Sequence, residues 1–498
     1  MRLDKKLQQQ ITTENYKKIF NDLIKSKTDK LTNDVRLAMG VDGNDYENIE
    51  KNIDLFSKTF CNRASKGKYI FSPFREIQIP KAPYSKFEFK EAEKAGKLRT
   101  LAISTINDTI LQKMIYNTIY EYMEKKYNCI DSNIYGYRKG KSVKQAIEKI
   151  QSYFLQGYTY GIDGDLEKYF DKINHDRLNL KINNFFKNDI LVKTYLYRFL
   201  KVKRVKVENK KLATKYYHEK PIADKRDLGI PQGGVLSGLL ANLYLYNFDK
   251  YVVYNLGSKY DLKYIRYADD FIILCKDKRI IMDLYKKINS YFNREKLHLH
   301  TIDSSSIDNS KPNNNKTKAI NLDKDHYIEF LGFKISKRYL GIKRDNITKF
   351  KKVIKHIIDV GIQEKADVGK VIYKINAKLL GNWIYGRGYF VPCEHCGKPQ
   401  KPQSWIGFFI NTSDMRQLKL LDVWIRKQIR HFWFVRYGIR PEKNYLRKPM
   451  LCPANEYYNC NVVSLFKEAC YIKTYLKKHE DISFCECEHY EPIVIPYS

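Results

Sequence analysis

Two adjacent carboxylates, Asp269 and Asp270, lie inside an apolar stretch that runs from Lys263 to Cys275. The short apolar runs on either side predict the two strands of a β-hairpin, with the acidic pair between them. Like charges side by side repel each other and resist desolvation, so a bound cation or a substrate is the natural compensation. This pair is the strongest single indication of function in the chain.

The net charge indicates the class of partner. The chain has 91 Lys and Arg against 56 Asp and Glu, which gives a formal charge of +35. Such an excess attracts polyanions, nucleic acid first. A compositionally biased genome is the alternative explanation, but the acidic residues have not risen in step. A membrane surface is a weaker alternative because there is no apolar run near about 18 residues and no signal segment, so we expect a cytoplasmic protein.

The polarity of the sequence and the spacing of its apolar residues change along the 498 residues, which predicts several domains. Residues 1–68 are polar and helix-prone, 69–335 mix strands with helices, 336–440 have helical spacing, and 441–498 form a short C-terminal appendage. Alternating or apolar runs predict strands at 69–81, 96–103 and 327–333. Apolar residues at helical spacing predict helices at 108–126, 235–254, 279–296, 347–360, 368–383 and 414–437.

A second acidic group precedes the hairpin. Asp163 and Asp165 follow an apolar strand and share one of its faces or lie near its end. Phosphoryl transfer by two metal ions about 4 Å apart needs carboxylates from separate strands, and Asp165 with Asp269 and Asp270 supplies such a set. Mg²⁺ is the metal expected for hard oxygen ligands. Taken alone, Asp165 is equally well read as a helix cap and Asp269 as a turn residue.

The order of the motifs resembles that of prokaryotic reverse transcriptases, most closely those of group II introns, over residues 69–437. The similar segments are Ile79 to Lys81, Gly96 to Arg99, Asp108 to Gln112, Tyr135 to Ser142 (similar to "YGFRPGRS"), Asp163 to Asp171, Gly229 to Ser237, Tyr267 to Asp270, Lys316-Thr317 and Phe330 to Gly332. The resemblance implies an α+β right-hand polymerase with fingers and palm over 69–335 and an α-helical thumb over 336–440.

The resemblance also assigns roles to residues of this chain. Asp165, Asp269, Asp270 and the backbone of Leu166 would bind two Mg²⁺ ions, with Asp163 as a supporting carboxylate. Five residues would contact the deoxynucleoside triphosphate: Lys97 and Arg99 at its phosphates, Phe170 as the wall that excludes a ribose 2′-OH, Gln232 from the glycine-rich loop, and Lys316 as a proton donor to pyrophosphate.

Basic residues in two segments would contact the nucleic acid: Arg138, Lys141, Arg426, Lys427 and Arg430. Those on the helix at 414–437 resemble a thumb helix that grips phosphates without reading sequence. The implied partners are an RNA template, a DNA product and deoxynucleotides, and a homo-oligomer stays open.

Departures from the intron pattern leave the cellular role open. Residues 84–95 look inserted, Gly238 replaces a usual proline, and Ser104 and Asn107 replace the usual Pro and Arg. About 60 residues follow the thumb, too few for the DNA-binding and endonuclease modules of an intron protein. We therefore expect a free-standing enzyme that works with a structured noncoding RNA in antiphage defence. The alternatives are an endonuclease-lacking intron maturase and a noncatalytic RNA-binding splicing cofactor.

Cysteines outside this pattern suit a zinc site within the thumb. Cys393 and Cys396 have the C-x-x-C spacing of a tetrahedral Zn²⁺ knuckle near 391–403. Cys485 and Cys487 would complete it, with Cys452 and Cys460 as another choice of second pair. Scattered reduced thiols are the alternative, because the second half has irregular spacing.

Overall fold

The computed structural model describes most of the chain, and two compact units divide it. The described residues are 2–27, 40–81, 84, 88–130, 133–206, 226–302, 316–325, 327–380, 405–441, 450–451, 457–458 and 462. The first unit takes residues up to 79 and 99–326, and the second takes 80–98 and most of the chain from 327 onward. The four predicted zinc ligands, Cys393, Cys396, Cys485 and Cys487, lie outside the described residues.

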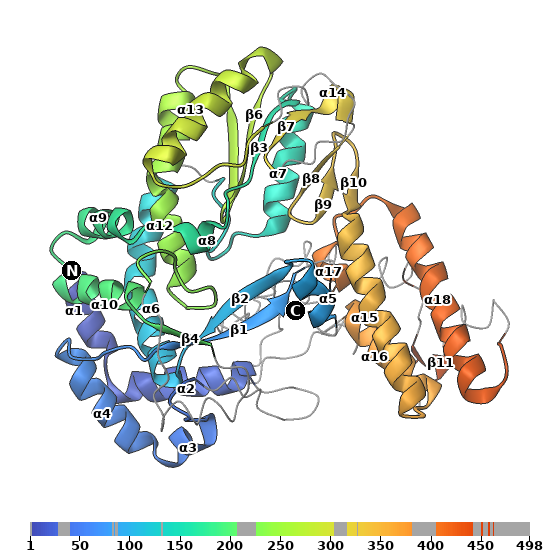
Figure 1. Cartoon of the computed structure of the whole chain (residues 1–498), viewed down its shortest axis with the longest axis horizontal. Coiled ribbons are helices and arrows are strands. Elements are labelled where there is room, and N and C mark those ends of the chain that lie inside the picture. Colours follow the sequence, from blue (N-terminus) through green and yellow to red (C-terminus); the bar gives the residue numbers. More distant parts are fainter. Residues whose placement is uncertain are drawn as a thin grey trace, which may run out of the picture. The chain divides into compact units, whose positions relative to one another are not determined.

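The first unit contains a four-stranded antiparallel sheet. Its order is β5 (Lys263–Tyr267), β6 (Asp270–Cys275), β3 (Tyr160–Gly164) and β7 (Lys318–Asn321), and β3, β6 and β7 are labelled in the upper part of Figure 1. Phe271 to Cys275 are all fully buried, which explains why this strand is a continuous apolar run rather than an alternating one. The predicted hairpin is therefore correct, and β6 lies inside the sheet rather than at its edge.

Helices of the first unit surround this sheet and share its core. They include α6 (Ile106–Asn128), α7 (Val143–Leu155), α9 (His175–Phe186), α10 (Ile190–Leu200), α12 (Ser237–Lys250) and α13 (Ile281–Arg294). The predicted helices at 108–126, 235–254 and 279–296 are present with shifted ends, and α12 continues as a π-helical segment, Tyr251–Leu256. A second sheet has the order β2 (Leu98–Ile103), β1 (Phe74–Pro80) and β4 (Arg204–Lys206).

The N-terminal residues are helical, as predicted, and pack into the first unit. They form α1 (Leu3–Gln10), α2 (Thr13–Lys27), α3 (Tyr46–Lys51) and α4 (Ile53–Ser65). Tyr16, Phe20 and Phe60 belong to the same buried cluster as Ile110 of α6 and Ile273 of β6. These helices are thus part of the core that supports the sheet.

The second unit is mainly helical beyond a small meander of β8 (Ile328–Phe330), β9 (Phe333–Ile335) and β10 (Leu340–Ile342). Its helices are α5 (Phe89–Lys94), α15 (Arg344–Gln363), α16 (Val368–Leu380), α17 (Trp405–Phe408) and α18 (Met415–Tyr437). The predicted helices at 347–360, 368–383 and 414–437 correspond to α15, α16 and α18. Within the part of the chain that the structure describes, no helix is long and apolar enough to cross a membrane.

The close approach of β3 to β6 depends on Gly164. In the register of these strands Gly164 lies opposite Phe271. A Cβ added to Gly164 would lie 2.1 Å from the Phe271 ring, which is fully buried. Only a residue without a side chain therefore fits at this position.

We expect Gly164→Ala to lower the free energy of unfolding by about 1–3 kcal/mol, because the added methyl group overpacks against a ring that cannot move. Urea denaturation measures the change. Phe271→Leu is the matched second variant: it makes room, so the double variant should lose less than the sum of the two single losses. Strict additivity would contradict this reading of the contact.

Candidate active site

The acidic pair lies at the tip of the β5–β6 hairpin, as the sequence predicts. The two strands pair down to Tyr267 and Asp270, which leaves Ala268 and Asp269 as the turn. Ala268 has a φ of 59°. This left-handed conformation is strained for a residue with a Cβ, and such strain persists only where the surroundings hold the backbone.

One of the elements that hold the turn is a segment from much earlier in the chain. The backbone N–H of Tyr135 donates to the carbonyl of Arg266 at 2.8 Å, and the N–H of Arg266 donates to the carbonyl of Asn133 at 3.1 Å. A Cβ on Gly136 would lie 2.1 Å from the backbone nitrogen of Ala268. The glycine of the Tyr135 to Ser142 motif thus lets two backbones meet at the turn.

A buried ion pair beneath the turn holds it from the other side. The side chains of Arg266 and Asp249 are both 0% exposed. Nε and Nη2 of Arg266 donate to the two carboxylate oxygens of Asp249 at 2.7 and 2.6 Å. Nη1 of Arg266 donates to the carbonyl of Ala268 at 2.6 Å and to Oδ1 of Asn242 at 2.9 Å. Since Asn242 and Asp249 lie on α12, Arg266 ties the strained turn to that helix.

β3 brings Asp163 and Asp165 to the end of the sheet at which the hairpin turn lies. Asp163 pairs with Ile272 and Gly164 with Phe271, so Asp165 comes next, at the level of Asp270. Asp163 and Asp165 both raise the pKa of Asp270, as expected if their negative charges lie near it. The predicted meeting of Asp165 with the hairpin pair agrees with this arrangement.

The acidic cluster makes the hairpin carboxyl groups hard to ionise. Desolvation raises the pKa of Asp269, and the charge of Asp165 raises it further. Desolvation also raises the pKa of Asp270 well above its ordinary value, followed by repulsion from Asp269, Asp163 and Asp165. Arg99 opposes both shifts, so its guanidinium lies within electrostatic reach. The cluster as a whole favours a proton or a cation.

Three polar side chains surround Asp165, and two of them match the predicted Lys316-Thr317 motif. The hydroxyl of Thr317 accepts from the backbone N–H of Asp165 at 3.2 Å, and Nζ of Lys316 lies 3.6 Å from Oδ2 of Asp165. Nε2 of His300 lies 3.3 Å from the same oxygen. His300 was not predicted, because it lies outside every motif of the sequence; the hydrogen bond from its backbone N–H to the Asp165 carbonyl brings it to the site.

The carboxylates fit a hard divalent cation in donor type and in charge. Oδ2 of Asp165 is buried and has no hydrogen-bond partner, although the side chains of Lys316 and His300 lie near it. Asp269 and Asp270 add oxygen donors whose mutual repulsion a cation would relieve. No group of three or more His, Cys, Asp or Glu among the described residues already converges on one point. The carboxylates therefore suit a divalent cation in the type and charge of their donor atoms, but they do not form a complete coordination shell.

An aromatic wall stands beside the acidic cluster. Phe170 lies on α8 (Tyr169–Lys172) and is partly exposed, with its ring edge-on to Tyr137 at 6.1 Å and to Tyr169 at 5.7 Å. A Cβ on Gly238 would lie 2.4 Å from the Tyr137 ring. The departure from proline at residue 238 thus makes room for the ring that backs Phe170.

The glycine-rich loop packs between this wall and strand β2. The N–H of Ile230 donates to the carbonyl of Phe170 at 2.8 Å, and the carbonyl of Gln232 accepts from the N–H of Ala102 at 2.7 Å. The loop is thereby fixed at both ends, and Gln232 is partly exposed. Lys97 is exposed and belongs to the second unit, whereas Arg99 belongs to the first.

Two residues predicted to contact nucleic acid are buried in internal ion pairs. The side chain of Arg138 is 1% exposed and bound to Glu124 at 2.7 Å, and that of Arg426 is 11% exposed and bound to Asp422 at 2.7 Å. Both predictions need correction, because these guanidinium groups are already occupied by carboxylates. Lys427 is exposed, whereas Lys141 and Arg430 are partly exposed.

Comparison with known proteins decides the family. The family model described as "Reverse transcriptase (RNA-dependent DNA polymerase)" matches residues 79–335, just over half of the chain. The matched range contains the acidic hairpin, β3, the glycine-rich loop and the aromatic wall. This chain belongs to the reverse transcriptase family. Its α+β fold is accordingly that of a right-hand polymerase, and group II intron-encoded proteins are among its relatives.

Those relatives are only partly covered. "Protein YkfC" of Escherichia coli (strain K12) is 27% identical over 48% of this chain and 63% of its own length. "Group II intron-encoded protein LtrA" of Lactococcus lactis is 30% identical over 41% of this chain and 29% of its own length. The chain thus spans less than two thirds of the curated relatives it matches.

Solved structures give a weaker likeness. A telomerase from Candida tropicalis, solved with a fragment of telomeric RNA, superposes with a TM-score of 0.37 at 13% identity. That superposition covers 66% of this chain and 56% of the telomerase chain. The family assignment therefore rests on the sequence match.

Replacing Arg266 with Met should lower the free energy of unfolding by about 3–5 kcal/mol, because it leaves the charge of Asp249 buried and unpaired. Urea denaturation followed by far-ultraviolet circular dichroism measures the loss. The control is the double variant Arg266→Met with Asp249→Leu, which removes both charges and should recover most of the stability. A single variant as stable as the unmodified protein would show that the pair does not support the hairpin.

Proposed function

We propose that this chain is an RNA-directed DNA polymerase that extends a 3′-OH with deoxynucleotides on an RNA template. The observation that carries the proposal is the acidic cluster of β3 and the β5–β6 hairpin, built on a turn that Arg266 and Gly136 hold in a strained conformation. A binding scaffold has no use for several carboxylates that raise one another's pKa beside a polyanion. Their cost to folding is offset only if they act on a cation-dependent reaction.

The carboxylates supply the reaction centre in this proposal. Asp165, Asp269, Asp270 and the backbone carbonyl of Leu166 would hold two Mg²⁺ ions, whose chemistry is to activate the attacking hydroxyl and to stabilise the leaving oxygen. Lys316 reaches this centre, with its side chain 64% exposed and its Nζ 3.6 Å from Asp165. It is the proposed proton donor to pyrophosphate.

Residues around the acidic cluster supply substrate recognition. Arg99 is proposed to bind the triphosphate through its planar fork, and Lys97 to add a point charge. Gln232 contacts the incoming nucleotide from a loop fixed to β2 by its own carbonyl. Phe170 lies against the sugar, where an aromatic wall leaves room for hydrogen but not for hydroxyl.

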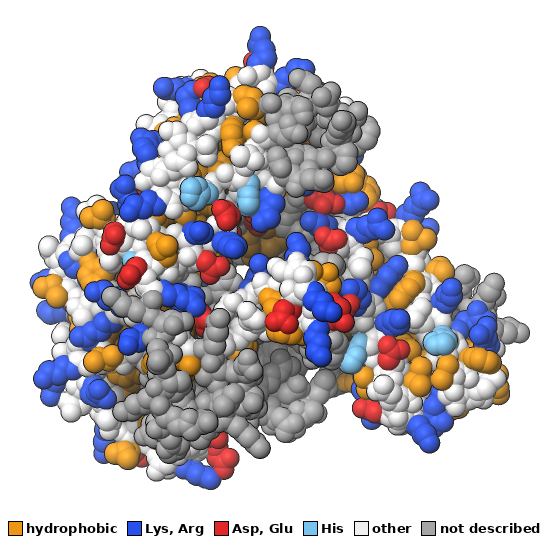
Figure 2. Space-filling view, in the orientation of Figure 1, with side chains coloured by type: hydrophobic (Ala, Val, Ile, Leu, Met, Phe, Trp, Pro, Cys, Tyr) orange, Lys and Arg blue, Asp and Glu red, His pale blue; other side chains and the backbone are white. Residues whose placement is uncertain are grey.

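Exposed cations are proposed to hold the RNA and its DNA product. Lys427 and Arg430 lie on α18, and Lys141 belongs to the Tyr135 to Ser142 motif, which abuts the hairpin turn. Figure 2 shows Lys and Arg side chains spread over the face in view, which agrees with the charge of +35. Such contacts hold phosphates without reading sequence, so affinity should fall steeply with salt.

The biological role is a separate proposal. The inserted residues 84–95 and the substitutions at Ser104, Asn107 and Gly238 are the basis for proposing work with a dedicated structured noncoding RNA in antiphage defence, whereas the likeness to group II intron-encoded proteins favours an intron maturase. Sequencing the RNA and DNA that copurify with the protein from cells separates them. Intron RNA would support the maturase, and one noncoding RNA with its complementary DNA would support the defence role.

We expect Asp269→Ala to reduce DNA synthesis on a primed RNA by about a hundredfold or more, since it removes a proposed metal ligand. RNA binding, measured by filter retention, should stay within about twofold of the unmodified protein. Asp277→Asn is the matched control, because Asp277 is a partly exposed acidic residue paired with Arg279 near the other end of β6. Persistent synthesis by the Asp269 variant would defeat the assignment.

Phe170→Ala should lower the preference for deoxynucleotides over ribonucleotides by about 10-fold or more, because the ring's volume is what excludes the 2′-OH. Competition between the two nucleotide types at a single template position measures the ratio. Phe170→Tyr keeps the ring and should keep the preference. An unchanged ratio in the alanine variant would mean that another residue forms the wall.

A further inference from the structure

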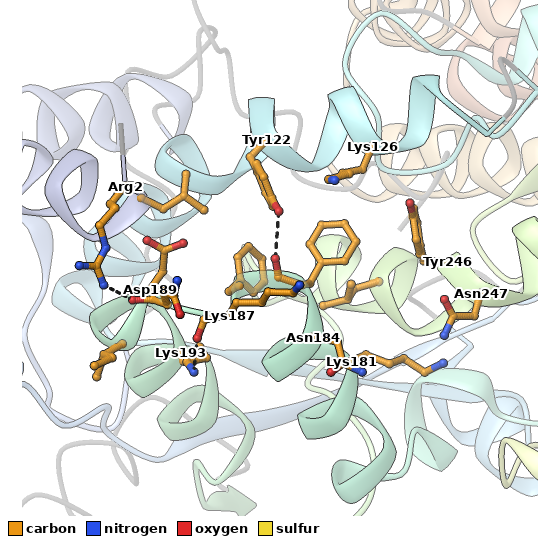
Figure 3. A pocket seen from close by; sticks show the side chains of 16 residues that line it. Arg2, Tyr122, Lys126, Lys181, Asn184, Lys187, Asp189, Lys193, Tyr246 and Asn247 are labelled. Carbon is orange, nitrogen blue, oxygen red and sulfur yellow. Dashed lines mark hydrogen bonds between the residues drawn. The ribbon is translucent and has the colours of Figure 1, made fainter.

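A pocket of about 980 Å³ lies in the first unit, and none of the carboxylates of the acidic cluster lines it. Its wall comes from the start of α1, the C-terminal half of α6, α9 and α10 with the turn between them, and α12. Figure 3 shows Tyr122 and Lys126 of α6 on one side of the space, with Lys181 of α9 and Lys193 of α10 on the other.

The pocket is strongly basic. Its ionisable lining residues are Arg2, Lys126, Lys181, Lys187, Lys193 and Asp189. Lys181 is paired with Glu295 at 2.9 Å. The other four cations have no carboxylate within ion-pair distance among the residues described. Positive charges gathered in a concave surface repel one another and focus the field, so the pocket attracts an anion.

Aromatic rings give the pocket a second kind of contact surface. Tyr122, Phe185 and Tyr246 line it, and all three are partly exposed. Phe185 packs edge-on against Tyr122 at 5.7 Å and against Tyr246 at 5.2 Å, and the Tyr122 hydroxyl donates to the Phe185 carbonyl at 3.0 Å. These contacts hold the rings in place, as a stacking surface requires.

We infer that this pocket binds a single-stranded segment of the RNA partner, apart from the acidic cluster proposed to carry out nucleotide addition. Cations beside fixed aromatic rings are the combination that holds phosphates while unstacked bases lie on side chains. The volume is at the upper end of the range for small-molecule pockets, about 300–1,000 Å³, so more than one nucleotide fits. The inference rests on the proposed function, because that function supplies the RNA.

The test is RNA affinity of the full chain with Lys126→Glu and Lys187→Glu combined. Binding of a single-stranded RNA oligonucleotide, measured by fluorescence anisotropy at several salt concentrations, should weaken about 10-fold or more. The dependence of log affinity on log salt should become shallower by about 1.4, since two phosphate contacts are lost. The matched control is Lys58→Glu with Lys66→Glu, the same charge change on exposed positions of α4 or its end, which should bind RNA almost as the unmodified protein does.

Three results would overturn the inference. The first is unchanged affinity in the pocket variant. The second is an equal loss in the control variant, which would show a nonspecific charge effect. The third is complete displacement of the RNA by millimolar uridine triphosphate with tight binding of that nucleotide alone, which would make the pocket a site for a free nucleotide.

Folding and the proposed function are tested separately. If the charge reversals lower the melting temperature, the variant Lys126→Gln with Lys187→Gln replaces them. It should give a smaller loss of RNA affinity in the same direction. Unchanged RNA affinity in this variant would overturn the inference. Primer extension by the unmodified protein tests the polymerase proposal alone. Failure of extension with pocket-dependent RNA binding would defeat the polymerase and leave the RNA site standing.

Discussion

The buried pair of Arg266 and Asp249 is the interaction on which the acidic hairpin depends. Two charges without solvent are expensive, and their attraction offsets the desolvation only with good hydrogen-bond geometry, which the four bonds donated by the three guanidinium nitrogens supply. One of those acceptors is the carbonyl of Ala268, in the residue before Asp269. The pair therefore fixes the position of the turn relative to α12.

The Arg266–Asp249 pair supports a site whose environment disfavours the ionised form of its own carboxyl groups. Asp269 and Asp270 are desolvated and repel their neighbours, yet Arg99 moderates that repulsion, and Lys316 lies beside Asp165. Strain in the Ala268 turn adds to the cost. Such costs gather where a protein needs a fixed arrangement of charge before its ligand arrives.

The sequence predicts the elements of this site better than it predicts what its arginines do. The hairpin was predictable because an apolar run flanks two acids, and the Asp163 to Asp171 motif because its strand runs into carboxylates. Arg138 and Arg426 look like surface cations in a chain with so many, although Asp422, four residues before Arg426, is a visible partner at helical spacing. Arg266 needs Asp249 and Asn242, which only the packing of α12 brings together. The core contacts of the N-terminal helices could not be predicted either, because they are made with segments that are distant in the sequence.

The meeting of Gly136 with the hairpin turn has a consequence for the order of folding. The two strands of the hairpin are local and can pair early, but the backbone at Ala268 adopts its final shape only when the segment around Gly136 arrives from far away in the sequence. A nascent chain that has made its hairpin would thus carry the two aspartates in a loose turn. The final arrangement of the two carboxylates would then form late in folding, because it depends on the assembled core and not on the hairpin alone.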